Sequence, residues 1–371
     1  MIEVQGKYAN ATVFTDTAEE YAIAQVKQLC DQKAMEGCKI RLMPDVHPGK
    51  VGPIGFTATV GEKVMPAVAG IDIGCGMTMA KIRKGKLEFQ KLDAVIRDNV
   101  PSGFSKRSAP HRFADGFGFD RLRCVSHINV ARAKSSMGTL GGGNHFIEID
   151  KDDSGSPYII IHTGSRHLGK EVAEYYLTEG QKALKEAGVE AVYELTYLEG
   201  KLRDDYLNDM AVVQEFASEN RLAILDEISK GMKWKLEEAE SVIHNYIDFR
   251  DSVPMLRKGA ISALKDEPVI IPVNMKDGVI LGKGLGNSKW NMSAPHGAGR
   301  ILSREQAKSS HTVAEFKKEM KGIYSSSIGK GTLDEAPFAY RSIDDVLPLI
   351  GDTVEITDVL KPVYNFKAGN D

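Results

Sequence analysis

The sequence predicts an α+β fold: one domain, residues 1–371, in which helices surround a mixed or mostly antiparallel β-sheet. Short runs rich in β-branched and aromatic residues end at glycine-containing turns in several places. Helical periodicity is concentrated in the middle of the chain. The two patterns do not alternate regularly, as they would in a doubly wound parallel sheet, and no Pro/Ser-rich linker separates two halves.

Strands are predicted at six places: CKIRLMPDV (38–46), PIGFTATV (53–60), HFIEID (145–150), YIIIHTG (158–164), PVIIPVNM (268–275) and GVILGKG (278–284). Apolar residues that recur at steps of three and four predict a helix over 207–228 with one buried face. A second helix is predicted over about 232–246. The polar stretch 101–121 is the best candidate for a flexible loop.

Composition sets limits on the environment. The net charge of −3 gives no overall case for a nucleic-acid binder, although residues 250–308 carry 10 Lys or Arg against 5 Asp or Glu. No apolar run approaches the roughly 18 residues that suggest a membrane span. The N-terminus lacks the pattern of a signal peptide. The four cysteines are not closely spaced as in a disulfide framework, which is typical of proteins in a reducing compartment, where thiols stay free. We therefore expect a cytoplasmic monomer that does not enter a membrane.

Five residues have the chemistry of metal ligands. Asp72 and Cys75 stand three residues apart among glycines in AGIDIGCG (69–76), and His145, His162 and His244 follow in separated segments. Each alone is explained as well by a tight turn or a structural histidine. Together they form a plausible ligand set for one or two divalent ions. Thiolate and imidazole favour zinc or cobalt, whereas the carboxylate also admits manganese.

The segment SAPHGAGR (293–300) suggests phosphate chemistry. His296 is followed by Gly297, Ala298 and Gly299, whose amides can hold phosphate oxygens, and then by Arg300, which can pair with a phosphate bidentately. A neutral imidazole can attack phosphorus and form a covalent intermediate. The alternative is a glycine turn followed by the N-terminus of a helix. The chain contains neither GxxxxGK[ST] nor the KxDG motif of lysine nucleotidyltransferases.

These motifs resemble the RtcB-type RNA-splicing ligases over nearly the whole chain. The matching segments are MPDVHPG (43–49), AGIDIGCGM (69–77), GTLGGGNHFIEI (138–149), IHTGSRHLG (161–169), HNY (244–246), RKGA (257–260), HGAGR (296–300) and Lys367. The resemblance implies a ligase that depends on GTP and manganese. It would join RNA 3′-phosphate ends, or 2′,3′-cyclic phosphate ends after opening them, to 5′-hydroxyl ends in RNA repair or tRNA splicing.

The resemblance also implies roles for individual residues. It makes His296 the nucleophile that takes GMP. It implies two manganese sites that share a cysteine, with ligands Asp72, Cys75 and His145 in one and Cys75, His162 and His244 in the other. Guanylate contacts are implied for Asn144, His145, Phe146, Ile147, Glu148, His244, Asn245, Pro272, Val273, Asn274, Met275, His296, Gly297, Ala298, Gly299 and Lys367.

One segment departs from the family pattern and marks a divergent member. The chain reads Pro272-Val273-Asn274-Met275 where relatives have a Pro-Gly-Ser-Met turn, and Val279 replaces a downstream serine. Valine is bulkier and stiffer than glycine, and an amide offers different hydrogen bonds from a hydroxyl. We therefore predict a less strict preference for GTP.

Two other functions are compatible with parts of this pattern. A metal-dependent phosphodiesterase that opens cyclic phosphates without ligation would need the metal ligands but not His296. A protein that only binds RNA ends would need neither the metals nor the nucleophile, and the presence of every expected ligand disfavours it.

Overall fold

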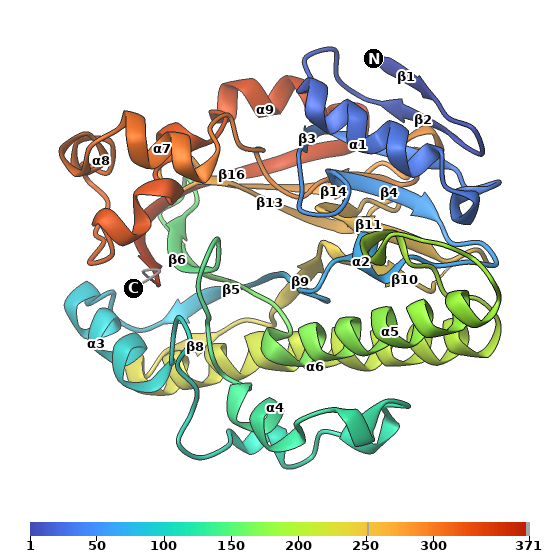
Figure 1. Ribbon diagram of the computed structural model, residues 1–371. Coiled ribbons are helices and arrows are strands. Elements are labelled where there is room, and N and C mark those ends of the chain that lie inside the picture. The colour runs from blue at the N-terminus through green and yellow to red at the C-terminus, as the bar shows by residue number, and fades with distance from the viewer. Residues whose placement is uncertain (251, 369–371) are drawn as a thin grey trace.

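The computed structural model describes residues 1–250 and 252–368, and its strands form two large sheets and one small pair (Figure 1). The first sheet has the order β1 (Ile2–Gln5), β2 (Asn10–Val13), β3 (Ile40–His47), β4 (Ile54–Thr59), β11 (Met255–Lys258), β10 (Asn245–Asp248). The second has the order β13 (Pro268–Asn274), β14 (Gly278–Gly284), β16 (Val354–Lys367), β6 (Phe146–Lys151), β7 (Pro157–Thr163), β5 (Gly76–Lys84), β8 (Lys235–Leu236), and β9 (Glu240–Ile243) also pairs with β5. The small pair is β12 (Ala260–Ser262) with β15 (Ser293–Pro295).

The pairing confirms the predicted sheet type. Among the described strands β2 and β3 run parallel, and every other ladder is antiparallel. All six predicted strands are present, as β3, β4, β6, β7, β13 and β14.

Two long helices, α5 (Arg166–Glu186) and α6 (Gly200–Met232), lie side by side below the sheets (Figure 1). Ile224 and Ile228 of α6 pack in one apolar cluster with Ile159 and Ile161 of β7, which confirms the predicted helix over 207–228 and its buried face. The other helices are α1 (Glu20–Cys30), α2 (Pro66–Ala69), α3 (Phe89–Asn99), α4 (Val130–Ser136), α7 (Arg304–Ser310), α8 (Val313–Glu319) and α9 (Ile343–Ile350). None of the described helices combines the length and the apolar character that crossing a bilayer requires.

The second sheet also buries its other face. Met77 and Met79 of β5 pack with Phe146 of β6, Ile270 of β13 and Val279 of β14, so the sheet curls over onto itself. The ladders place Gly76 opposite both Thr163 and Ile243, and His162 opposite Phe146. Four strand ends therefore lie together at one edge of the sheet: the starts of β5 and β6 and the ends of β7 and β9.

The prediction of a helix over about 232–246 is wrong. The helix α6 ends at Met232, and Lys233 adopts a left-handed conformation (φ 58°) that stops it. The residues that follow form β8, β9 and β10, because pairing with β5 and β11 overrides local propensity. The stretch 101–121 is irregular, as expected for a loop, apart from two 3₁₀ turns at Arg112–Ala114 and Phe119–Arg121.

Candidate functional site

The shared edge of the second sheet gathers the five predicted metal-ligand side chains. Asp72 lies in the turn between α2 and β5, and Cys75 directly precedes β5. His145 directly precedes β6, and His162 lies near the end of β7. His244 lies between β9 and β10, and not at the helix end that the sequence suggested.

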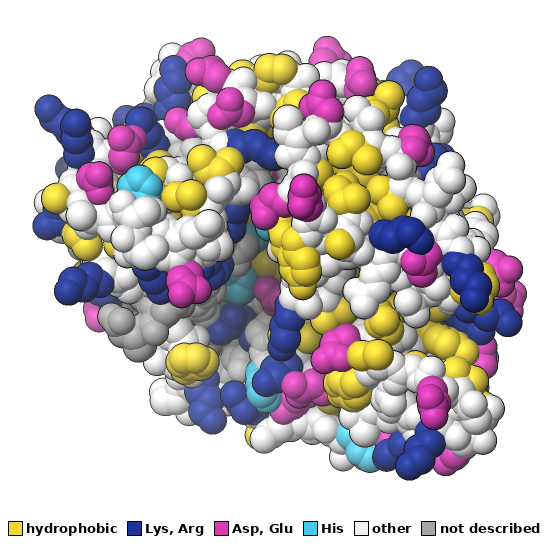
Figure 2. All heavy atoms as spheres, turned by 45° about the horizontal axis from the view of Figure 1, so that its top comes forward, with side chains coloured by type: hydrophobic (Ala, Val, Ile, Leu, Met, Phe, Trp, Pro, Cys, Tyr) yellow, Lys and Arg dark blue, Asp and Glu magenta, His cyan; other side chains and the backbone are white. Residues whose placement is uncertain are grey.

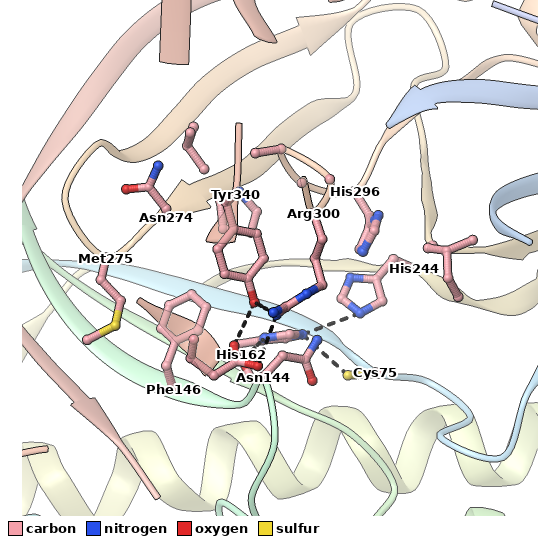
Figure 3. Close-up of a pocket in the computed structure, with 18 of the residues that line it drawn as sticks. Cys75, Asn144, Phe146, His162, His244, Asn274, Met275, His296, Arg300 and Tyr340 are labelled. Atoms are coloured by element: carbon pink, nitrogen blue, oxygen red, sulfur yellow. Dashed lines mark hydrogen bonds and ion pairs between the residues drawn. The ribbon is translucent and has the colours of Figure 1, made fainter. Parts of the chain in front are cut away.

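These side chains form two groups of three that share Cys75. In each group the potential ligand atoms all lie within 4.8 Å of one another. Cys75 Sγ is 3.4 Å from the Nε2 atoms of both His145 and His162. His145 Nε2 lies 3.1 Å from Asp72 Oδ2, and His162 Nε2 lies 3.3 Å from His244 Nε2. Figure 3 shows Cys75, His162 and His244 pointing toward one another.

Backbone carbonyls orient two of the imidazoles. His145 Nδ1 lies 2.9 Å from the carbonyl of Leu140, and His162 Nδ1 lies 3.1 Å from that of Asn144. A ring that donates its Nδ1–H to a carbonyl presents the lone pair of Nε2 to the cluster, as metal-ligating histidines do. Burial holds the pKa values of His162 and His244 well below their usual range, so both rings are neutral at neutral pH.

The acidic groups also suit a cation. Burial acts to raise the pKa of Asp72, but the hydrogen bond from His145 Nε2 and the charge of its ring prevail and lower it to about 2; a bound cation would take the place of that Nε2 proton. Burial and the neighbouring Asp72 raise the pKa of the Cys75 thiol, and a bound divalent cation would reverse this by taking the thiolate as a ligand. Gly164 leaves room for the carboxylate, since a Cβ there would lie 2.2 Å from Asp72 Oδ1. The donor set therefore fits one or two divalent ions.

A fourth histidine approaches the cluster from the small β12–β15 pair. His296 follows β15, and its ring packs edge-on against His244 with 4.9 Å between ring centroids. Its Nδ1 lies 2.8 Å from Oδ2 of the buried Asp45 on β3. The carboxylate fixes the tautomer with the proton on Nδ1, which leaves Nε2 with its lone pair. Asp45 was not predicted as a site residue, although it lies in the segment MPDVHPG.

A cavity of about 310 Å³ opens beside His296 and the cluster, within the size range of small-molecule sites. Figure 2 shows the hollow on the surface, with histidine side chains at its floor. Most of the predicted guanylate contacts line it: Asn144, Phe146, Glu148, His244, Asn245, Pro272, Val273, Asn274, Met275, His296, Gly297, Ala298, Gly299 and Lys367.

Two predicted contacts do not line this cavity. Ile147 is fully buried on the opposite face of β6 and packs with Ile159 and Ile161. Successive side chains of a strand alternate between faces, so Ile147 points away when its neighbours Phe146 and Glu148 point in. The side chain of Ile147 therefore does not line the cavity, and its guanylate contact stays a prediction. His145 turns toward the metal-ligand cluster instead.

The cavity has a polar wall in which the sequence analysis identified Lys367 and Glu148 but missed Glu335, Tyr340 and Asn365. Lys367 Nζ lies 3.0 Å from Glu335 Oε2, and Tyr340 donates its hydroxyl to the same oxygen at 2.6 Å. Asn365 donates to Glu148. Burial raises the pKa of Glu148 to about 7. Residues 330–339 form short 3₁₀ turns without a recognisable motif, so no local signal marked this wall.

Arg300 lines the cavity and also braces its wall. Its guanidinium donates to the Tyr340 hydroxyl at 2.9 Å and to the carbonyls of Asp334 and Leu302 at 2.6 and 3.0 Å. These contacts fix its position, and its pairing with a phosphate stays a prediction. The expected helix N-terminus is also displaced, since α7 begins only at Arg304.

The turn that departs from the family pattern closes the β13–β14 hairpin. Asn274 Oδ1 accepts hydrogen bonds from the backbone N–H groups of Lys276 and Asp277 at 2.9 and 3.0 Å, and Nδ2 donates to Asp277 Oδ2 at 2.8 Å. Val273 is almost fully buried in an apolar cluster with Ile271 and Ile280. Both residues line the cavity, but the polar atoms of Asn274 are already used by the turn.

Comparisons with known proteins agree with this architecture. A family profile described as tRNA-splicing ligase RtcB matches residues 25–119 and 114–368. The chain belongs to the RtcB family. It is 31% identical to the RNA-splicing ligase RtcB of Escherichia coli strain K12 over 368 residues, which cover 88% of this chain and 90% of the relative. It is 28% identical to the tRNA-splicing ligase RtcB of Nanoarchaeum equitans over 394 residues, covering 82% of this chain and 83% of that protein.

Membership of the RtcB family confirms the resemblance drawn from the motifs. A third relative, RNA-splicing ligase RtcB2 of Escherichia coli strain ATCC 25922, is 27% identical over 389 residues, which cover 94% of this chain and 92% of the relative. The match extends through nearly all segments that carry the cluster, the cavity and His296. The role of each residue within this RtcB-type site stays a prediction.

Proposed function

We propose that this protein is an RNA ligase that uses GTP and manganese to join RNA 3′-phosphate or 2′,3′-cyclic phosphate ends to 5′-hydroxyl ends. The relatives are named as RNA-splicing or tRNA-splicing ligases, which supports the general activity. We also propose that it acts as a monomer in the cytoplasm, in RNA repair or tRNA splicing.

One observation carries the proposal: His296 is held by Asp45 through Nδ1, at the edge of a nucleotide-sized cavity that also contains the cysteine-histidine cluster. In the first step His296 Nε2 attacks the α-phosphorus of GTP. A P–N bond forms, the bond from this phosphorus to the bridging oxygen breaks, and pyrophosphate leaves. Asp45 stabilises the positive charge that develops on the imidazole, as a buried carboxylate does for a nucleophilic or basic histidine.

Two metal sites would serve this chemistry. Asp72, Cys75 and His145 would hold one manganese ion, and Cys75, His162 and His244 would hold the other. When bound, the ions neutralise negative charge on the phosphates and orient them for displacement. The imidazoles of His162 and His244 are neutral and the carboxylate of Asp72 is ionised, whereas the Cys75 thiol would lose its proton on binding an ion.

The later steps use the same residues. A cyclic phosphate end is first hydrolysed to the 3′-phosphate. An oxygen of the RNA 3′-phosphate then attacks the guanylate phosphorus, and the P–N bond to His296 breaks. The 5′-hydroxyl oxygen of the second RNA end finally attacks the 3′-phosphorus, GMP leaves, and the hydroxyl proton passes to solvent. Lys367 and Glu148 lie on the cavity wall where they can contact the guanine base.

The test is labelling with radioactive GTP and manganese, followed by denaturation. The protein should retain label that is labile to acid and stable to alkali, as a phosphoramidate is, and His296→Ala should not. RNA with a 3′-phosphate and a 5′-hydroxyl should then be joined. Label retained by His296→Ala would refute the nucleophile. Opening of cyclic phosphate ends without any joining would instead establish a phosphodiesterase.

A further inference from the structure

A second carboxyl group lies behind the polar wall of the cavity beside His296. Glu148 lines the cavity, whereas Asp150, two residues later on β6, does not. Side chains two residues apart on a strand point to the same face, so both carboxyl groups share the face of β6 that carries Phe146. That face lies inside the curl of the second sheet, among apolar residues of β5, β7, β13 and β14. Asp150 is fully buried, and Glu148 is 2% exposed.

No described residue donates a hydrogen bond to Asp150. Both of its carboxyl oxygens are buried without a donor, and the group within hydrogen-bonding reach is the carboxyl of Glu148. Tyr158, its ladder partner on β7, directs its hydroxyl to Asp152 at 3.3 Å. A buried carboxylate without a donor is costly, and two carboxylates this close repel each other. Burial and the charge of Glu148 raise the pKa of Asp150 well above its usual range, so Asp150 holds a proton and donates it to Glu148.

Three neighbours act against burial to keep Glu148 ionised. Burial raises the pKa of Glu148 to about 7. Hydrogen bonds from Asn365 and Asp150 act to lower it, and the charge of Lys367 acts in the same direction. The ammonium of Lys367 is shared with Glu335, 3.0 Å away, so it does not belong to Glu148 alone. The proton of Asp150 therefore helps to hold Glu148 ionised close to neutral pH.

The charge of Glu148 decides which base edge the cavity wall accepts. An ionised carboxyl group only accepts hydrogen bonds, whereas a neutral one also donates through its O–H. Asn365 adds a second acceptor, since its Oδ1 is buried without a donor among the described residues. Acceptors match guanine, whose N1–H and N2–H₂ groups donate along one edge of the base. Adenine presents a lone pair at N1 and fits a neutral Glu148 instead.

We propose that Asp150 is a positioning residue for base selection, which donates its proton to Glu148 and so keeps the cavity wall an acceptor for guanine. The inference rests on the proposed ligase function for the presence of a guanine nucleotide. The shared proton does not, because it follows from the burial and the contact of the two carboxyl groups. Lowering the pH should weaken guanine binding as Glu148 takes up a proton, and removing Asp150 should move that loss to higher pH.

The first test detects the shared proton and needs no nucleotide. In infrared spectra a protonated carboxyl group gives a C=O stretching band separate from the bands of ionised carboxylates. At about pH 8, above the pKa of Glu148, the unmodified protein should show this band, and Asp150→Asn should lose it. Glu148→Gln should keep the band, since Asp150 stays buried. Asp153→Asn is the matched control, because the Asp153 side chain is 86% exposed and ionised, and it should leave the band unchanged.

The second test follows the affinity for GMP, which has no leaving group and cannot modify His296. Binding to the manganese-loaded protein is measured by calorimetry between about pH 6 and 8.5, on both sides of the pKa of Glu148. Asp150→Val removes the donor, so the midpoint should rise by about one pH unit and the affinity at about pH 7 should fall by about 5- to 10-fold. Asp150→Asn should keep the profile of the unmodified protein, because its Nδ2–H₂ donates in place of the acid. AMP should bind without the loss at low pH.

Each result decides one part of the proposal. An infrared band retained in Asp150→Asn would overturn the shared proton. An unchanged midpoint in Asp150→Val, or an equal shift in Asp150→Asn and Asp150→Val, would overturn the role in base selection. The infrared comparison stands by itself if Asp150→Val does not fold. If the band is lost in Asp150→Asn but the unmodified protein binds no GMP, the proposed ligase function fails and the shared proton remains.

Discussion

Replacing Asp45 by asparagine should slow guanylylation of His296 without disturbing the metal cluster. The substitution keeps the shape of the side chain and removes the charge that faces His296 Nδ1 at 2.8 Å. Hydrogen bonds to a charged group contribute about 1.5–3 kcal/mol, against about 0.5–1.5 kcal/mol between neutral groups. The difference of about 1–2 kcal/mol corresponds to a rate that falls by about 5- to 30-fold, since about 1.4 kcal/mol is one factor of ten.

The loss should be larger if the new amide turns its NH₂ group toward the ring. Nδ1 must then accept a hydrogen bond, the ring proton moves to Nε2, and the lone pair that attacks phosphorus is no longer available. In that case the loss approaches the roughly 10²- to 10⁴-fold range of lost general acid–base assistance. Folding should change little, because Asp45 Oδ1 is buried with no hydrogen-bond partner among the described residues, and neutralising it removes a desolvation cost.

The assay is the single-turnover rate of label transfer from GTP at saturating manganese, with bound metal measured in the same samples. Asp45→Asn should keep the metal content of the unmodified protein, since Asp45 is not one of the potential ligands. A guanylylation rate within twofold of the unmodified protein would refute the positioning role of Asp45. A parallel loss of metal would show that Asp45 acts on the cluster and not on His296.

Three further outcomes follow from the site. Cys75→Ala should lose most bound manganese by elemental analysis, because Cys75 belongs to both ligand groups; two ions retained would refute the bridge. The protein should prefer GTP over ATP less strictly than relatives with the Pro-Gly-Ser-Met turn do, and the double variant Val273→Gly/Asn274→Ser should restore a strict preference. A strict preference for GTP in both the unmodified protein and the double variant would contradict the role of these two positions. Because burial raises the pKa of Glu148 from 4.5 to about 7, its contribution to stability is full below about pH 4.5 and is lost as the pH rises through about 7. Asp150→Asn removes a second buried carboxyl group whose pKa is raised, so the free energy of unfolding, measured by denaturant titration, should fall less steeply with pH in this variant. An unchanged dependence on pH would refute the interaction between Glu148 and Asp150.

The sequence predicted the fold class and six of the described strands, because these strands carry their own signal, but it left most of the helices unassigned. Runs such as YIIIHTG are apolar and rich in β-branched residues, which predicts buried strands, and the turns between them contain glycine. The failure over 232–246 has a physical cause. The segment Glu240–Ile243 becomes a strand through its pairing with β5, more than 150 residues earlier in the chain, and no local pattern encodes such a partner.

Residue spacing predicted the site in its parts, and only the family resemblance implied how they assemble. Asp72 and Cys75 belong to one turn, so their proximity could be inferred from spacing alone. The convergence of His145 and His162 depends on the register of β6 and β7, which only the ladder determines. Asp45 lies on β3 and His296 lies just after β15, 251 residues later in the chain, so no local pattern in the sequence predicted their contact. The orientation of Ile147 could be inferred from the sequence, because strand alternation already places its side chain on the opposite face from Phe146.

One side chain of the long helix α6, Arg221, links two of the segments that carry the metal-ligand cluster. Arg221 is fully buried and donates to the carbonyls of Gly74 and Thr163 at 2.8 and 3.1 Å. One side chain therefore ties the turn that carries Cys75 to the end of the strand that carries His162. Burial lowers the pKa of Arg221 to about 10, which still leaves it charged at neutral pH. A buried cation is costly unless negative charge lies near it; the carboxylate of Asp72 supplies such charge, and the thiolate that Cys75 would form with a bound metal would add to it. Metal binding and the stability of this interior should for that reason be coupled, since forming the thiolate lowers the electrostatic cost of the arginine that holds the strand ends together.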